Sequence, residues 1–310
     1  MLKIISGLAV VVGLVASIQA TENDVKLAQE QSAVHVTIGG MPFTTYHVGS
    51  NDGKPYVRPY FYPVLAGDGT KVTADQLTEG GDHPHHRSMY VAHGAVNGVD
   101  QWALKKNPAK QRHVKFDKVE GDTIVQELAW EDDQGEPMLK EIRTLRFLAL
   151  PDGSRGVDFT LVFEPVSGPV TFEDTKEAGL CTIRAAKEIS QKGSVVIMNA
   201  TGATGEKNIW GKPAKWCDIS GKIDGKPYGI AILDHPSNPR HPSNWHVREY
   251  GLMGANVFGL HDFDKQNPKG NGDFKMEKGK PVTFKYRVVI HPGNAKAAGL
   301  DQKWDSFAGK

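Results

Sequence analysis

"HVKFDKVEGDTIVQELAWEDDQGEPMLKEIRTLRFLALPDG" (residues 113–153) is the stretch that decides the fold class. Apolar and polar residues alternate along most of it, and a Gly-Asp pair and a polar loop at Asp132–Pro137 interrupt the alternation. A period of two is typical of a strand with one buried face, and turn residues between two such runs join antiparallel neighbours. We therefore predict three consecutive antiparallel strands in this stretch.

The same pattern returns in "RGVDFTLVFE" (155–164) and "VTFKYRVVIH" (282–291), and 34 glycines and 18 prolines are scattered evenly as turn residues. Helix periodicity is scarce. The best helical candidate, "DTKEAGLCTIRAAKEI" (174–189), fits a strand equally well. Many short strands with few helices indicate two packed layers. We predict an all-β fold, a large antiparallel β-sandwich, in which residues 21–310 form a single domain.

The first twenty residues have the features of a secretory signal peptide. Lys3 precedes an apolar run, and Ala20 offers a small residue before the polar "TEND". An uncleaved membrane anchor is the alternative interpretation. We expect residues 1–20 to be removed, so that the mature protein is periplasmic or extracellular and has no membrane span.

The charge balance narrows the class of partner. Without Lys3, 36 basic residues balance 36 acidic residues, and no basic stripe interrupts the sequence. A neutral chain of this kind is not expected to bind nucleic acid or an anionic membrane. The remaining partner class is a small molecule or an oligosaccharide.

The chain has two cysteines, Cys181 and Cys217, and neither lies in a CxxC pattern. In an oxidising compartment they could pair or remain free. Two cysteines are too few to be the main scaffold in either case.

Four stretches concentrate polar groups: 80–94 ("GGDHPHHRSMYVAHG"), 172–179 ("FEDTKEAG"), 199–216 ("NATGATGEKNIWGKPAKW") and 234–251 ("DHPSNPRHPSNWHVREYG"). The first and last both contain Asp-His-Pro, a second histidine and an arginine. Proline stiffens such loops, and sandwich proteins place their sites on loops. We expect these two histidine loops to rim one cleft.

Acid–base chemistry on a sugar is the leading hypothesis for these loops, because imidazole titrates near neutral pH and can donate or accept a proton. His86 and His246 are the predicted proton-transfer groups, and Asp174 or Glu173 is the predicted carboxylate. Tryptophans of the last two stretches could offer an apolar face to a sugar ring, although a core position is the more common role of tryptophan. The predicted substrate-binding residues are Arg87, His93, Asn97, Asn244, Trp245 and Arg248.

Three alternatives remain open. A metal-dependent oxidoreductase or hydrolase would use His83, His85 and His241 as ligands of a divalent transition metal, whereas the leading hypothesis requires no cofactor. A non-catalytic glycan-binding module would bind sugars without changing them. The histidines could also be purely structural turn residues. The sequence contains no phosphate-binding GxxxxGK[ST] loop and no GxSxG nucleophile motif.

The motifs "DHPHHR…HGAVNGVDQW", "EDTKEAGL…IR", "NATGATGE…WGKPAKW" and "DHPSNPRHPSNWHVREYGL" resemble, in the same order, a family of secreted bacterial proteins. That family is labelled PmoA-like, or methane oxygenase PmoA, and is also catalogued as a domain of unknown function. The resemblance runs from about Lys54 to His291. Ser88 departs from the family pattern, which has glycine after "HPHHR", and a serine would restrict that turn if it needs a positive φ.

The family is found in bacteria that degrade complex polysaccharides, so the resemblance implies a glycan-related role. The PmoA subunit of particulate methane monooxygenase is an integral membrane protein, and for this reason we expect no methane monooxygenase activity. By architectural analogy, we expect a sandwich in the style of the aldose epimerases and polysaccharide-lyase domains, and fold alone does not define function.

Overall fold

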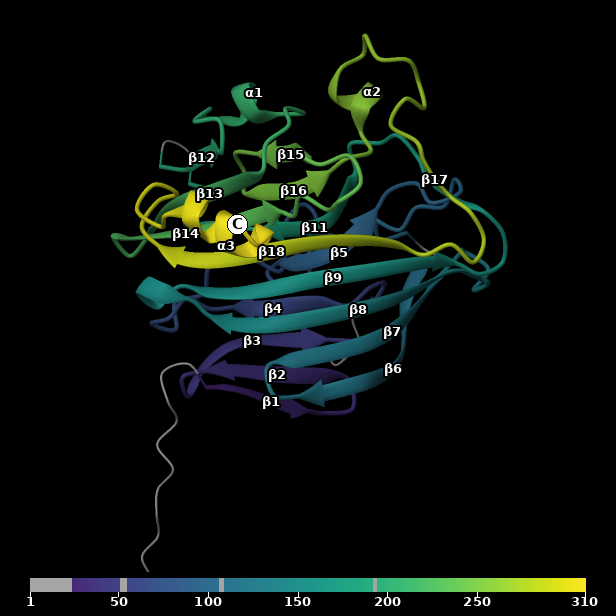
Figure 1. Ribbon diagram of the computed structural model, residues 1–310. Helices are drawn as coiled ribbons and strands as arrows, with labels where there is room; N and C mark the ends of the chain where they lie inside the picture. The colour runs from purple at the N-terminus through teal and green to yellow at the C-terminus, as the bar shows by residue number, and fades with distance from the viewer. Residues whose placement is uncertain (1–23, 51–54, 106–108, 192–193) are drawn as a thin grey trace, which may run out of the picture.

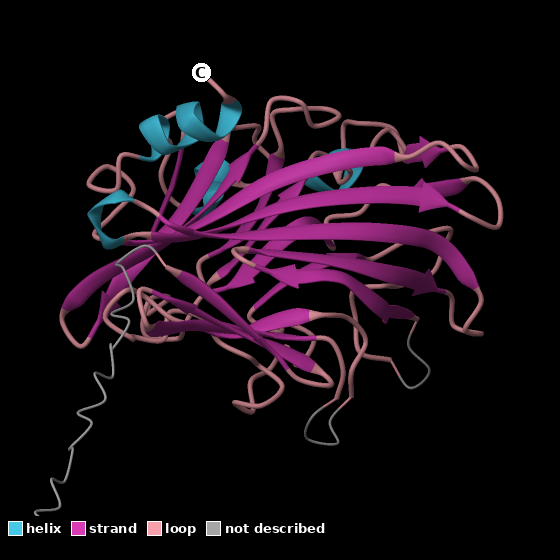
Figure 2. Ribbon diagram, turned by 60° about the horizontal axis from the view of Figure 1, so that its bottom comes forward, coloured by secondary structure: helices cyan, strands magenta, loops and turns pink. Residues whose placement is uncertain are grey.

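The computed structural model describes residues 24–50, 55–105, 109–191 and 194–310. The predicted signal peptide, residues 1–20, lies outside the described residues. Two large antiparallel sheets dominate the described chain, and their inner faces pack against each other (Figures 1 and 2). The predicted all-β antiparallel sandwich is therefore confirmed.

The first sheet has eight strands, and each neighbouring pair is antiparallel. In spatial order the strands are β1 (Val25–Gln29), β2 (Ala33–Ile38), β3 (Met41–His47), β4 (Tyr60–Val64), β5 (Met89–His93), β11 (Ala178–Arg184), β16 (Leu252–Asn256) and β15 (Asn244–Arg248). This order places strands from three distant parts of the sequence side by side at one edge.

The second sheet also has eight antiparallel strands. Their spatial order is β12 (Val196–Asn199), β13 (Trp216–Ile223), β14 (Lys226–Asp234), β18 (Val282–Pro292), β9 (Arg155–Pro165), β8 (Pro137–Ala149), β7 (Thr123–Glu131) and β6 (Lys110–Glu120). The three strands predicted within residues 113–153 are β6, β7 and β8, so this prediction is confirmed.

Short elements complete the described chain. They are the paired strands β10 (Val170–Phe172) and β17 (Phe274–Met276), the helices α1 (Glu206–Ile209), α2 (Leu260–Phe263) and α3 (Leu300–Ala308), and the 3₁₀ turn η1 (Pro151–Gly153). None of the helices in the described residues is long and apolar enough to cross a membrane.

The alternation of β9 and β18 places their aromatic and aliphatic side chains in the core between the sheets. Phe163 of β9 packs against Phe284 of β18, with ring centroids 6.2 Å apart. Val289 breaks the alternation of β18 and is nevertheless buried, because it belongs to a second apolar cluster with Trp304 of α3 on the outer face of the sheet. Helix α3 therefore explains why one segment of β18 is apolar on both faces.

Residues 174–189, which fitted a helix or a strand, contain strand β11. All seven of its residues are buried, because β11 lies between β5 and β16 in the middle of the first sheet. Cys181 of β11 and Cys217 of β13 are both buried and free, so they form no disulfide with each other. Burial raises the pKa of both thiols.

A polar network is buried between the sheets. Arg143 donates to Glu141 through Nε (2.6 Å) and Nη2 (2.9 Å), and Trp130 donates from Nε1 to the same carboxylate at 2.7 Å. Arg143 also donates to the hydroxyl of Tyr46, which donates to Gln126. We call these five residues the core network. It ties β3 of the first sheet to β7 and β8 of the second.

Candidate functional site

The two histidine loops meet at a cavity of about 690 Å³, which we call the histidine cleft. Its lining comes from the first loop, from the segment after β5, from the segment before β11, from α1, from β15 and from the turn after β15. The lining residues are His83, His85, His86, Gly94, Asp100, Trp102, Ala103, Thr175, Lys176, Glu177, Glu206, His246, Arg248 and Tyr250.

The first loop forms a turn that brings three imidazoles together. The backbone N–H of His86 donates to the His83 carbonyl at 2.8 Å, and the two rings stack with centroids 4.9 Å apart and an interplanar angle of 4°. The ring of His85 meets that of His86 edge-on at 4.4 Å. Arg58 donates to the His85 carbonyl at 2.9 Å, which anchors the turn from below.

Ser88 follows this turn with φ at 63°, a backbone conformation that glycine adopts more readily. The side chain is buried, and its hydroxyl donates to Thr73 at 2.7 Å. The turn does need a positive φ, and serine takes it.

His246 enters the cleft from β15, and Trp102 links it to the first loop. The Trp102 ring lies 5.9 Å from the His86 ring and 6.1 Å from the His246 ring, between centroids. Strands β5, β11, β16 and β15 are consecutive in the first sheet, so β5, which follows the first loop, and β15, which carries His246, are separated by two strands. The two predicted proton-transfer residues thus face one cavity.

Burial keeps His85, His86 and His246 neutral at pH 7. It lowers the pKa of His246 to about 4. It also lowers the pKa of His85 to about 4, with a further contribution from the positive charge of Arg58. The pKa of His86 lies far below its ordinary value, chiefly because of burial, with smaller contributions from His85 and Arg184.

The contact between Arg184 and His86 shows which nitrogen of the neutral His86 ring carries the proton. Arg184 lies next to His86 Nδ1, with its Nη1 at 3.3 Å, and a guanidinium can only donate. His86 Nδ1 is therefore the acceptor, and the proton of the neutral ring is on Nε2.

His246 has the opposite arrangement. A hydrogen bond to the backbone of Lys176 favours its charged form, which means that the ring donates there. Its Nδ1 is buried and has no hydrogen-bond partner among the described residues. Trp102 Nε1 is likewise buried without a partner in the described part of the chain.

The acidic residues of the cleft are each paired with a cation. Lys176 pairs with Glu177, its neighbour in the chain. Arg248 pairs with Glu206 at 2.7 Å, and its guanidinium lies over the ring of Trp210, with Cζ 3.8 Å from the centroid. The third carboxylate, Asp100, pairs with Lys105 at 3.0 Å outside the lining.

Two predicted substrate-binding residues of the first loop are buried away from the cleft. Arg87 pairs with Asp75 at 2.6 Å, and its Cζ lies 4.0 Å from the ring centroid of Tyr60. His93 packs against Phe172, and its Nε2 donates to the Glu173 carbonyl at 2.9 Å. Neither side chain lines the histidine cleft.

Two further predicted binding residues serve the fold at β15. Trp245 is fully buried in the core, and its Nε1 donates to the Ala214 carbonyl at 3.0 Å. Asn244 donates to the Gly211 carbonyl at 2.8 Å. Alternation along the strand turns Trp245, the neighbour of His246, to the other face. Asn244 lies two positions from His246 and does not line the cleft.

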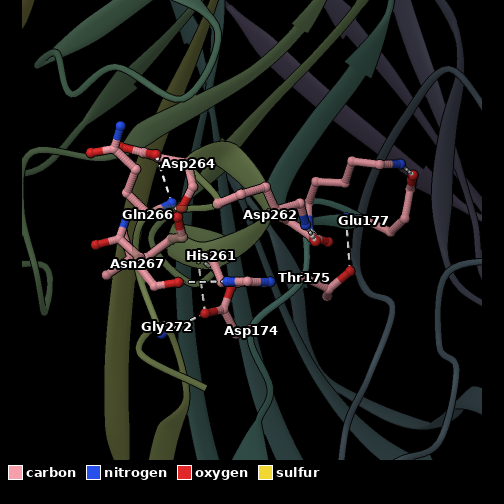
Figure 3. Close-up of polar contacts among 12 residues, drawn as sticks. Asp174, Thr175, Glu177, His261, Asp262, Asp264, Gln266, Asn267 and Gly272 are labelled. Carbon is pink, nitrogen blue, oxygen red and sulfur yellow. Dashed lines mark hydrogen bonds and ion pairs between the residues drawn. The ribbon is translucent and has the colours of Figure 1, made fainter. Parts of the chain in front are cut away.

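The predicted carboxylates lie at a second cavity, of about 700 Å³, which also includes the predicted binding residue Asn97. The carboxylate of Asp174 accepts the backbone N–H groups of His261 and Gly272, at 3.0 and 2.8 Å (Figure 3). Glu173 lines the same second cavity. Asp174 therefore shapes the loop around α2, and Glu177 is the acidic residue of this segment that reaches the histidine cleft.

The metal-ligand set proposed from the sequence is not assembled. His241 pairs with Asp234 at 2.8 Å and stacks on Trp304 of α3, whereas His83 and His85 line the cleft. In the ranges that the structure describes, no group of three His, Cys, Asp or Glu side chains is arranged to hold a metal ion.

Several cleft residues were missed in the sequence. Glu177 and Lys176 lie in the polar stretch 172–179, Tyr250 lies in the second histidine loop, and Trp102 lies eight residues after the first. Glu206 lies in the glycine-rich stretch 199–216, which was noted for its polar groups. These residues could have been found only because they lie in or near the four polar stretches of the sequence. That proximity does not indicate which side chain of a stretch lines the cleft.

A family model described as "Family of unknown function (DUF6807)" matches residues 33–305. The chain belongs to this family. This membership agrees with the expected domain of unknown function, and the PmoA-like label remains a resemblance read from the sequence. No curated protein matches the chain.

Two solved structures illustrate what the chain resembles. One is a GalM/aldose epimerase homologue from C. elegans, with 7% identity and a TM-score of 0.35, covering 87% of this chain and 99% of that chain. The other is HI1317, with 10% identity and a TM-score of 0.27, covering 86% of this chain and 99% of that chain. The function of this DUF6807 member has to be argued from its cleft.

Proposed function

We propose that this protein binds a sugar in the histidine cleft and catalyses proton transfer on it. One observation carries the proposal: His86 and His246, more than 150 positions apart in the sequence, pack against the same indole of Trp102 at one cavity. Both imidazoles are held neutral, and a neutral imidazole can serve as either an acid or a base.

The hydrogen bonds of the two rings support complementary roles. His86 carries its proton on Nε2, because Arg184 occupies Nδ1, so it is the proposed acid. His246 donates to the Lys176 backbone and has an unpaired Nδ1, so it is the proposed base. Glu177, whose charge raises the pKa of His246, replaces Asp174 and Glu173 as the proposed carboxylate.

The rest of the lining supports a polyhydroxylated ligand. Trp102 and Tyr250 offer aromatic surface, and Glu206 and Arg248 offer an acceptor and a donor for hydroxyl groups. A cavity of about 690 Å³ is within the range of small-molecule sites, which combine apolar surface with a few placed polar groups. We also propose that the protein works outside the cytoplasm, as the predicted signal peptide suggests.

The test is a panel of monosaccharides and oligosaccharides incubated with the mature protein. Conversion is followed by NMR and binding by calorimetry. We expect His86→Ala and His246→Ala each to lower turnover by about 100-fold or more, the usual contribution of a general acid or base. The melting temperature should stay within a few degrees of the wild-type value.

His235→Ala is the matched control. His235 belongs to the second histidine loop but packs against Phe307, with centroids 5.0 Å apart, outside the cleft. It should retain wild-type turnover. Full activity in both cleft variants, or unfolding of both, would refute the proposed roles. Binding without conversion, unchanged between about pH 5 and 8, would identify a non-catalytic glycan-binding module.

A further inference from the structure

Arg184, at the end of β11, lies behind the first histidine loop. Its side chain is buried, with the residue only 7% exposed. The guanidinium donates to His86 Nδ1, and its Cζ lies 4.6 Å from the ring centroid of Tyr250. It forms no ion pair with any residue in the described ranges. A buried cation without an anionic partner is costly, so its retention needs an explanation.

Other buried arginines show how the fold normally satisfies this group. Arg58 donates to the backbone carbonyls of Gln101, His85 and Trp102, and Arg155 donates to three carbonyls in a distant part of the fold. Arg87 has the carboxylate of Asp75. Arg184 has one contact to an imidazole nitrogen and one to an aromatic face, and neither supplies a negative charge.

The carboxylates lining the cleft cannot supply it either. Glu177 and Glu206 are engaged with Lys176 and Arg248, and Asp100 is engaged with Lys105. Asp82, which attracts Arg184 from a distance, is itself paired with His83 at 2.7 Å and is largely exposed. The end of the cleft beside His86 therefore lacks one negative charge.

We propose that the ligand supplies this charge, and that the substrate is a sugar acid whose carboxylate binds at the His86 end of the cleft. The inference rests on the proposed function and specifies its substrate class. Arg184 donates to one nitrogen of His86, which polarises the N–H on the other side of the ring. That N–H donates to the carboxylate of the sugar acid. The positive charge of Arg184, on the other side of the imidazole ring, balances the negative charge of this carboxylate. Tyr250, 39% exposed, covers the guanidinium from the solvent side.

The experiment compares D-glucuronate and D-galacturonate with D-glucose and D-galactose by calorimetry at neutral pH. We expect each acid to bind the wild-type protein about tenfold or more tightly than its neutral counterpart, as a charge-assisted contact would give. High salt should weaken binding of the acids and leave that of the neutral sugars unchanged. The salt arm needs no variant, so it tests the proposal even if substitutions disturb folding.

Arg184→Gln removes the charge and should abolish the preference for the acids, whereas Arg184→Lys should retain most of it. Arg155→Gln is the matched control, because it removes a buried guanidinium far from the cleft and should keep the preference. Neutral sugars that bind as tightly as the acids would overturn the inference and leave the proposed function intact. If neither class of sugar binds or is converted, the proposed function fails, and the inference fails with it.

Discussion

The core network and the histidine cleft both bury polar groups, but they treat them differently. In the core network, Arg143, Glu141, Trp130, Tyr46 and Gln126 are all buried, and their polar atoms bond to one another. In the cleft, buried nitrogen atoms of two residues that line the cavity have no partner among the described residues. These atoms are His246 Nδ1 and Trp102 Nε1.

The difference lies in whether each buried polar group has a hydrogen-bond partner. A buried polar group that is hydrogen-bonded contributes to a unique fold, whereas an unpaired one costs free energy until something binds it. The core network lies between the two sheets, and the cleft is lined by residues on and around β5, β11 and β15 of the first sheet. Two of the buried polar atoms without a partner in the described residues therefore belong to side chains that line the cleft, whereas the core network has its members bonded to one another.

The largest expected effect is in the core network. Glu141→Ala leaves Arg143 buried and unpaired, so the free energy of unfolding should fall by roughly 3–5 kcal/mol. Urea unfolding monitored by circular dichroism measures the change. Glu120→Ala, an exposed glutamate on β6 of the same sheet, is the control and should stay within about 0.5 kcal/mol of wild type. A loss below about 1 kcal/mol for Glu141→Ala would show that the network is not a stabilising unit.

The second prediction concerns acid lability of the cleft. His246 has a folded pKa of about 4, below the value near 6.5 expected in the unfolded chain. Between these values only the unfolded state binds the proton, so stability is full above about pH 6.5 and falls as the pH drops toward 4. His246 alone should account for about 3 kcal/mol of this loss.

Urea unfolding at a series of pH values measures how the free energy of unfolding changes with pH. His246→Gln should make this dependence weaker by the contribution of one titrating group. An identical slope in the variant would mean that His246 does not remain neutral in the folded protein. His85 contributes to the slope in the same direction, because its pKa is also lowered to about 4.

The third prediction compares two buried tryptophans directly. Trp130 donates to Glu141, whereas Trp102 Nε1 has no partner in the described residues. Trp130→Phe leaves the Glu141 carboxylate short of one donor and should cost roughly 1–3 kcal/mol beyond the change in packing. Trp102→Phe removes an unpaired donor and should cost clearly less. Equal losses in urea unfolding would mean that hydrogen bonding does not distinguish the two regions.

The strands could be predicted because their signal is local. The alternation within residues 113–153 depends only on neighbouring side chains, and β6, β7 and β8 formed where it predicted. The meeting of His86 and His246 depends instead on the order β5, β11, β16 and β15, which is a non-local property of the first sheet. The sequence indicated two similar loops, and only the topology brings them together.

The individual site residues were harder to predict for the same reason. Arg87 adjoins His86 in sequence, yet it turns toward Asp75, while Arg184 reaches His86 from β11. Asp174 and Glu177 are three positions apart and chemically alike, but only Glu177 lines the histidine cleft. Sequence proximity identified the segments, whereas the direction of each side chain depends on partners that are distant in the sequence.

The smallest expected effect gives the sharpest test of the comparison. His246→Phe replaces a buried imidazole that has an unpaired nitrogen with an apolar ring of similar shape, so the free energy of unfolding at neutral pH should change by less than about 1 kcal/mol, or rise. Urea unfolding measures this change, and the sugar assay should show loss of turnover in the same protein. A loss above about 2 kcal/mol would give His246 the same structural role as the members of the core network. A stable but inactive variant would instead show that the unpaired nitrogen is needed for turnover and not for folding.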